Sequence, residues 1–221
     1  MKDQITHIYK SDTKRAFLTF DDGPSNNTVS ILNILNNYGI KGNFFVLGTR
    51  VEAMPEMIKN IYDQGHFIGN HGYSHNYSQI YSSPQSVLDE YNKTNTLIAN
   101  AIGNSKYNSH LFRFPGGLAG GVYADIKNQA KQLLEENYIL NVDWNALTGD
   151  SEKSNPSPEY LMENLQKTTC NKNSVVILMH DSAAKKITAD MLPQVIEFLK
   201  QQGYEFKTFK DVLGDTQNLD L

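Results

Sequence analysis

Residues 19–25 read TFDDGPS and close the first apolar run of the chain, residues 16–20. Neighbouring side chains of a strand point to opposite faces, so two aspartates can serve one site only where the strand ends. Gly23 and Pro24 supply that end, because neither suits the interior of a central strand. One of Asp21 and Asp22 can then bind a cation while the other stays free as a general base. Taken alone, the stretch also fits a plain turn capped by an aspartate side chain.

On either side of this stretch, short β-branched or aromatic runs alternate with helical segments, as in parallel strands joined by helices. The expected strands cover residues 16–20, 42–47, 67–70, 111–114, 138–143, 175–179 and 205–208. The expected helices cover residues 29–38, 53–64, 84–102, 122–137, 158–171 and 188–202. Seven strands suit a barrel, but an open doubly wound sheet would give the same alternation. In an α/β barrel the catalytic groups lie at the C-terminal ends of several strands. The positions of the polar residues relative to the expected strand ends therefore decide between a barrel and an open sheet.

Several residues mark the expected helix ends. Ser83-Pro84 and Ser157-Pro158 each match an N-cap followed by proline at the first helical position. Glycines fall where C-terminal caps belong, at positions 39, 65, 103 and 203. The glycine-rich residues 116–121 are expected to form a loop inside one domain.

The composition excludes some classes of protein. The chain has 221 residues, 39% of them hydrophobic, which suits one globular domain. A net charge of −4 without long runs of like charge argues against a nucleic-acid partner. No apolar stretch approaches the ~18 residues of a membrane span, and the first 20 residues lack the apolar core of a signal peptide. The single cysteine, Cys170, is expected to be a buried thiol.

Further polar residues follow the later strands. His71 and His75 stand four apart, a spacing that places two imidazoles on one side of a helical turn, as in zinc sites. Arg113, Asp150 and His180 each come just after an apolar run. Each has an ordinary explanation as a surface ion pair, helix cap or turn residue. Five successive strand ends that all offer Asp, His or Arg point instead to one shared site.

Together these stretches resemble the five motifs of the polysaccharide deacetylases, carbohydrate esterase family 4, also called the NodB homology domain. The matching stretches are TFDDGPS, His71 with His75, RFPG at 113–116, Asp150 and LMH at 178–180. The resemblance covers about residues 15–213, so we expect an N-terminal extension over 1–14 and a C-terminal tail over 214–221. It implies a single-domain, distorted (β/α)7 or (β/α)8 barrel with a divalent metal, most often zinc, with cobalt or nickel as alternatives.

The resemblance also implies roles for individual residues. Three match the metal ligands: Asp22, His71 and His75. Four match proton-transfer groups and their supports: Asp21 as base, His180 as acid, Arg113 orienting the base and Asp150 supporting the acid. Asp143 of Asp143-Trp144 is the alternative to Asp150. Leu178 matches a residue that lines the pocket for the acetyl methyl group.

Chemical reasoning agrees with these roles and adds candidate substrate contacts. Hydrolysis of an acetamide needs a strong nucleophile, and a bound divalent cation lowers the pKa of water from ~15.7 to about 7. A backbone N–H near Gly116 can bind the developing oxyanion. Sugar rings stack on aromatic side chains, for which Tyr73, Tyr77 and Trp144 are available. The chain departs from the family at Gly72, where Ser or Thr is usual, and at Gly116, where an aromatic residue is common.

We therefore expect a metal-dependent hydrolase that removes acetyl groups from N-acetylated sugar polymers such as peptidoglycan N-acetylglucosamine or chitin-like oligomers. The alternatives are an O-acetyl esterase or another amidase on the same scaffold, and a noncatalytic carbohydrate-binding relative. The expected partner is an acetylated glycan, with no nucleic acid and no membrane span, and the expected state is a monomer. The expected location is extracellular or at the cell wall if the N-terminus was trimmed, and cytoplasmic if the chain is complete.

Overall fold

The computed structural model describes residues 2–214, with side chains from Ile5 onward, so the expected tail falls outside it apart from Gly214. The strands are β1 (Arg15–Asp21), β2 (Asn43–Val46), β3 (Phe67–Asn70), β4 (Leu111–Phe112), β5 (Leu140–Asn141), β6 (Ala146–Leu147), β7 (Ser174–His180) and β8 (Glu205–Phe206). The helices are α1 (Lys2–Tyr9), α2 (Asn26–Asn37), α3 (Gly48–Ala53), α4 (Pro55–Asp63), α5 (Tyr77–Ile80), α6 (Pro84–Ile102), α7 (Ala124–Glu136), α8 (Pro158–Thr169), α9 (Lys186–Gln201) and α10 (Phe209–Leu213).

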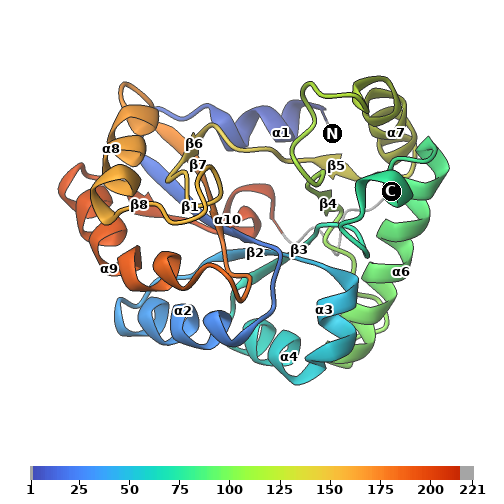
Figure 1. Cartoon of the computed structure of the whole chain (residues 1–221), viewed down its shortest axis with the longest axis horizontal. Coiled ribbons are helices and arrows are strands. Elements are labelled where there is room, and N and C mark those ends of the chain that lie inside the picture. The colour runs from blue at the N-terminus through green and yellow to red at the C-terminus, as the bar shows by residue number, and fades with distance from the viewer. Residues whose placement is uncertain (1, 215–221) are drawn as a thin grey trace.

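The strands form one parallel sheet in the order β5-β4-β3-β2-β1-β7-β6, with β8 paired to the start of β1. Helices surround this sheet on its outer side (Figure 1). Among the described strands β5 and β6 do not pair with each other, so the sheet is a half-barrel. The expected distorted (β/α)7 barrel is confirmed.

Strand β1 is buried on both faces, as its central position requires. Phe17 belongs to a core cluster inside the half-barrel, whereas Leu18 and Phe20 pack outward in the core beneath the helices. An apolar side chain at nearly every position is typical of a parallel strand covered on both sides. The run at residues 16–20 therefore determines the place of β1 in the middle of the sheet.

The expected helix signals are confirmed. Ser83 and Ser157 cap α6 and α8, where their hydroxyls accept hydrogen bonds from Ser86 N–H and Tyr160 N–H. The four C-terminal glycines have positive φ between 65° and 82°. Glycine adopts this left-handed conformation without the steric cost that a Cβ brings.

Helices α1 and α10, which the pattern of the sequence did not predict, cover the inner core. Ile8 of α1 is fully buried in the inner cluster, and Phe209 of α10 stacks on Phe17 with ring centroids 5.0 Å apart. The Tyr9 hydroxyl donates to the Asp143 carbonyl between β5 and β6. Helix α1 thus packs beside the open seam of the half-barrel.

Three expectations were wrong, concerning one helix, one strand and the burial of Cys170. Residues 53–64 are not one helix: α3 ends before Met54, whose backbone is non-helical (φ −141°, ψ 56°) because Pro55 disfavours a helical residue before it. Strand β6 was missed, since it is only two residues long. Cys170 is exposed rather than buried, because it follows the last residue of α8, where the chain turns back toward β7.

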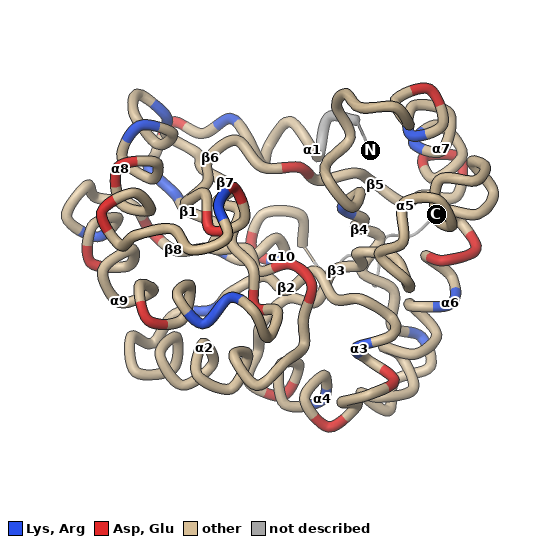
Figure 2. Tube along the Cα trace, viewed as in Figure 1, with Lys and Arg blue, Asp and Glu red and all other residues tan. Residues whose placement is uncertain are grey.

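The surface agrees with the charge balance of the sequence. Lys and Arg are interspersed with Asp and Glu around the molecule rather than gathered on one face (Figure 2). None of the described helices is both long enough and apolar enough to cross a bilayer.

Candidate active site

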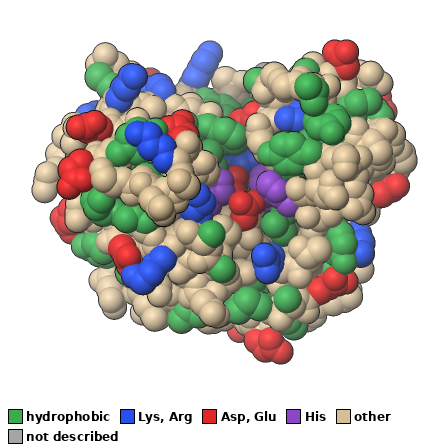
Figure 3. All heavy atoms as spheres, viewed as in Figure 1, with side chains coloured by type: hydrophobic (Ala, Val, Ile, Leu, Met, Phe, Trp, Pro, Cys, Tyr) green, Lys and Arg blue, Asp and Glu red, His purple; other side chains and the backbone are tan. Residues whose placement is uncertain are grey.

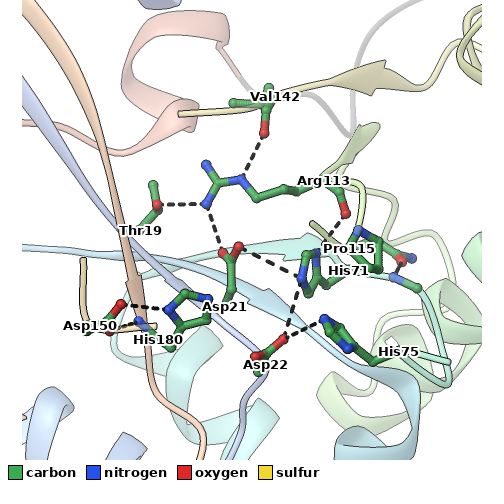
Figure 4. A network of polar contacts seen from close by, with 12 residues as sticks. Thr19, Asp21, Asp22, His71, His75, Arg113, Pro115, Val142, Asp150 and His180 are labelled. Atoms are coloured by element: carbon green, nitrogen blue, oxygen red, sulfur yellow. Dashed lines mark hydrogen bonds and ion pairs between the residues drawn. The ribbon is translucent and has the colours of Figure 1, made fainter. Parts of the chain in front are cut away.

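The polar residues of the motifs converge at the C-terminal edge of the sheet (Figure 4). In the parallel pairing of β1 with β7, Asp21 lies opposite His180. Asn70 at the end of β3 pairs with Phe112 of β4, which places His71 near Arg113. Strand register therefore brings together residues that are far apart in the sequence.

Asp22, His71 and His75 offer three ligand atoms that all lie within 4.8 Å of one another. Asp22 Oδ1 is 3.5 Å from His71 Nε2 and 3.4 Å from His75 Nε2. Two ligand atoms ~2.1 Å from a tetrahedral zinc ion would be about 3.4 Å apart. Asp22 Oδ1 is also buried and accepts no hydrogen bond from the described residues, so its lone pairs are available to a cation. The three residues therefore fit a divalent metal.

The hydrogen bond of His71 prepares its ring for metal binding. His71 Nδ1 lies 2.7 Å from the carbonyl oxygen of Arg113, so Nδ1 carries the proton and Nε2 presents its lone pair toward Asp22. Burial lowers the pKa of His71 to about 3, against the opposing charge of Asp22. A neutral imidazole with a fixed tautomer is the form that ligates metals.

Asp21 is buried beside the triad and is held by Arg113. Arg113 Nη1 donates to Asp21 Oδ1 and to Thr19 Oγ1, both at 2.8 Å, and Arg113 Nε donates to the Val142 carbonyl. Burial raises the pKa of the Asp21 carboxyl, and the charges of Arg113 and His180 oppose this rise. Burial thus acts against Arg113, whose charge favours the ionised carboxylate. A carboxylate with a raised pKa accepts a proton more readily.

His180 is paired with Asp150. His180 Nδ1 lies 2.8 Å from Asp150 Oδ1, and its backbone N–H donates to Asp150 Oδ2 at 2.7 Å. Burial disfavours the charged ring, but the hydrogen bond and charge of Asp150 outweigh it, and the pKa of His180 rises to about 9. Asp143, the alternative support, instead accepts a hydrogen bond from Leu118 N–H. The geometry therefore favours Asp150.

A cavity of about 280 Å³ opens over these groups. Figure 3 shows it as a hollow in which histidine and acidic side chains meet. The sequence-predicted residues that line it are Asp21, Asp22, His71, His75, Gly116, Trp144, Leu178 and His180. Arg113 and Asp150 lie behind this lining and contact Asp21 and His180.

Tyr73 does not join the cavity, contrary to expectation. Its hydroxyl donates to Glu52, and the Lys93 ammonium lies 3.2 Å from the centre of its ring. Its backbone turns toward α3 and α6, because its N–H and carbonyl both bond to those helices. Tyr73 is therefore a packing residue of the turn between the two histidines.

Tyr77, one of the candidate aromatic contacts, lines the cavity, and so do Ser151 and Lys185, which were not predicted as site residues. A Cβ at Gly116 would lie 2.5 Å from the Tyr77 hydroxyl oxygen, so the Tyr77 ring occupies the space that Gly116 leaves. Its position two residues after His75 was the available signal. Lys185 donates to the Asp150 carbonyl, a contact that no sequence pattern predicts.

Known proteins are similar to this chain in both sequence and fold. The family model for polysaccharide deacetylase matches residues 9–135. A peptidoglycan-N-acetylglucosamine deacetylase of Bacillus cereus is 31% identical over 205 residues, which cover 90% of this chain and 71% of that protein. The peptidoglycan-N-acetylmuramic acid deacetylase PdaA of Bacillus subtilis is 28% identical, with 96% and 76% covered. The catalytic domain of a peptidoglycan N-acetylglucosamine deacetylase from Eubacterium rectale superimposes with a TM-score of 0.82 at 31% identity, over 90% of each chain.

The half-barrel with a candidate metal triad beside a buried carboxylate and a histidine–aspartate pair defines a metal-dependent hydrolase. The chain belongs to the polysaccharide deacetylase family, carbohydrate esterase family 4, and is a polysaccharide N-deacetylase.

Proposed function

We propose that this deacetylase removes the acetyl group from N-acetylated amino sugars of peptidoglycan, with zinc bound by Asp22, His71 and His75. The observation that carries the proposal is the convergence of this triad with Asp21 and with the His180–Asp150 pair in one cavity. The names of the similar deacetylases support peptidoglycan as the polymer. Such a substrate places the enzyme at the cell wall.

Zinc suits the ligand set. Two imidazole nitrogens and one carboxylate oxygen are borderline ligands that zinc accepts, and three protein ligands leave one position open. Cobalt and nickel accept the same ligands, which makes them the alternatives to test. The chemistry that such a cation supplies when bound is polarisation of the acetamide carbonyl and activation of water.

The residues of the chain perform the proton transfers and bind the acetyl group. Asp21, oriented by Arg113, takes the proton of the attacking water. His180, charged through its contact with Asp150, donates a proton to the departing amine from Nε2, because Nδ1 is held by Asp150. The backbone at Gly116 faces the developing oxyanion, and Leu178 borders the space for the acetyl methyl.

Acetate release from peptidoglycan and from chito-oligosaccharides, measured with added zinc, cobalt or nickel, tests this function. We expect release by the wild type and a loss of about 10² to 10⁴ in kcat for Asp21→Asn, which removes the base. Zinc affinity should persist in Asp21→Asn, because Asp21 is outside the triad, and should fall in Asp22→Asn. No release with any metal would overturn the proposal. Release only from O-acetylated glycans would favour the esterase alternative.

A further inference from the structure

The turn between the two candidate metal-binding histidines, residues 71–75, is held by the carboxylate of Glu90 on α6. Glu90 Oε2 accepts hydrogen bonds from the N–H groups of Tyr73 (2.7 Å) and Ser74 (3.0 Å). Glu90 Oε1 accepts a third from the Ser74 hydroxyl at 2.7 Å. Both carboxylate oxygens thus accept hydrogen bonds from the backbone and side chain of this one turn.

Glu90 is an unusual residue to find inside a protein. It is only 8% exposed, and no Lys or Arg forms an ion pair with it among the described residues. A buried carboxylate without a cation loses several kcal/mol of hydration, which hydrogen bonds must offset. The three bonds from the turn are the contacts that do so, hence Glu90 and the turn stabilise each other.

The carbonyl groups of the same turn are held by both α3 and α6. The Gly72 carbonyl accepts from Gly48 N–H at 3.0 Å and from the Thr94 hydroxyl at 3.0 Å. The Tyr73 carbonyl accepts from Thr49 N–H at 3.1 Å. The turn is therefore held between α3 and α6: its amides bond to Glu90, and its carbonyls bond to the start of α3 and to Thr94 of α6.

The two histidines depend on these contacts to different degrees. The His71 ring has its own anchor in the Arg113 carbonyl. The His75 ring has no hydrogen bond to a backbone carbonyl among the described residues: its side chain is 34% exposed, and its backbone has the left-handed φ of 54°. A residue with a Cβ adopts this conformation only at an energetic cost, so it persists where the surrounding contacts impose it.

We infer that Glu90 is a positioning residue that sets the metal affinity of the site by holding the backbone ahead of His75. Through this backbone Glu90 keeps His75 Nε2 3.4 Å from Asp22 Oδ1 before any cation arrives. The inference rests on the proposed function, because it assumes that the triad binds zinc. It adds a residue that touches neither the metal ligands' donor atoms nor the cavity.

Zinc titration of the full chain, with a chromophoric chelator as competitor, tests this role in two variants. Glu90→Gln removes the charge and keeps the length of the side chain, and Glu90→Asp keeps the charge and withdraws the carboxylate from the turn. We expect each to weaken zinc binding by about 10- to 100-fold, the usual effect of losing a residue that supports a ligand. Excess zinc should restore most of kcat, and KM should stay within about twofold.

Asp89→Asn is the matched control. Asp89 is the neighbouring acid on α6, but it is exposed and contacts only Gln85 in the described structure. The same change of charge there should leave zinc affinity within about twofold, because a solvent-exposed charge is screened. Ser74→Ala removes one of the three bonds and should weaken zinc binding by about twofold to tenfold. If the Glu90 variants fold poorly, Ser74→Ala still tests the inference.

The outcomes separate the inference from the proposed function. If the wild type binds zinc and both folded Glu90 variants bind it equally well, Glu90 only stabilises the fold and the inference is wrong. If only Glu90→Gln weakens binding, the charge of Glu90 matters rather than its position, and the inference is again wrong. A wild type that binds no divalent metal would overturn the proposed function as well.

Discussion

Asp21 and Asp22 are neighbours in sequence, yet they have different surroundings and different proposed roles. Asp21 is the last residue of β1 and points into the half-barrel, where Arg113 holds it. Asp22 leaves the strand with φ of 73° and turns its carboxylate toward the two histidines. Such a break between the two aspartates was predicted from Gly23 and Pro24. What the sequence did not show is how deeply Asp21 is buried.

The pairing of His180 with Asp150 predicts the pH dependence of the reaction. His180 acts as an acid only while protonated, so its contribution is lost as pH rises through its pKa, raised to about 9. In Asp150→Asn the carboxylate that favours the charged ring is gone, and the proton leaves at lower pH. We expect the alkaline limb of kcat/KM, measured from about pH 6 to about pH 10, to move to lower pH.

A control on α9 checks that this movement comes from the pair itself. Asp190→Asn removes an exposed carboxylate that contacts Lys186, and the limb should stay where the wild type has it. An unmoved limb in Asp150→Asn would contradict the role of His180 as the acid.

At the scale of elements, residues 115–118 form a turn whose supporting contacts the sequence did not show. The Tyr81 hydroxyl donates to the Pro115 carbonyl, and Lys127 of α7 donates to the Gly117 carbonyl, each at 2.7 Å. Leu118 N–H donates to Asp143 at 3.0 Å. The turn that we propose binds the oxyanion is thus held by three side chains from other parts of the chain, Tyr81, Lys127 and Asp143.

Alanine substitutions in this loop should separate strain from function. Gly116→Ala and Gly120→Ala both force a Cβ into positive φ (74° in each), at a cost of about 1–2 kcal/mol in unfolding free energy. Only at Gly116 would the Cβ also meet Tyr77, whereas nothing lies within 4 Å at Gly120. We expect kcat to fall about 10- to 100-fold in Gly116→Ala, because the oxyanion contact is displaced. Gly120→Ala should keep the wild-type kcat, and equal kcat in both variants would refute this role of the turn.

The ends of a long element could be predicted from the sequence, whereas short strands were predicted with wrong ends or, for β6, missed. The helix over 84–102 matches α6 residue for residue, because it has an N-cap, a proline and a C-terminal glycine of its own. Strands β4, β5 and β6 have two residues each, so their ends depend on pairing with neighbours rather than on local preference. The motif residues were predictable because their chemistry is visible in their type. Glu90 and Lys185 were missed, because their contacts are created only by the fold.

For the molecule as a whole, α1 matters to stability rather than to chemistry. Ile8 is fully buried in the inner core cluster that also contains Phe17 and Phe209. We expect Ile8→Ala to lower the free energy of unfolding by about 2–5 kcal/mol, as measured by urea denaturation. His7→Ala, on the exposed side of the same helix, should change it by less than about 0.5 kcal/mol. A small loss in Ile8→Ala would show that α1 adds little to the core.

The pairing of β1 with β7 over seven residues, which sets Asp21 opposite His180, has a consequence for biosynthesis. A nascent chain that has not yet reached residue 174 already contains every candidate metal ligand but lacks the strand that carries the acid. The central strand of the sheet obtains this partner through a contact of high sequence separation, and such contacts slow folding. Hydrolytic competence therefore requires the docking of β7 on β1, after all the candidate metal ligands have been synthesised.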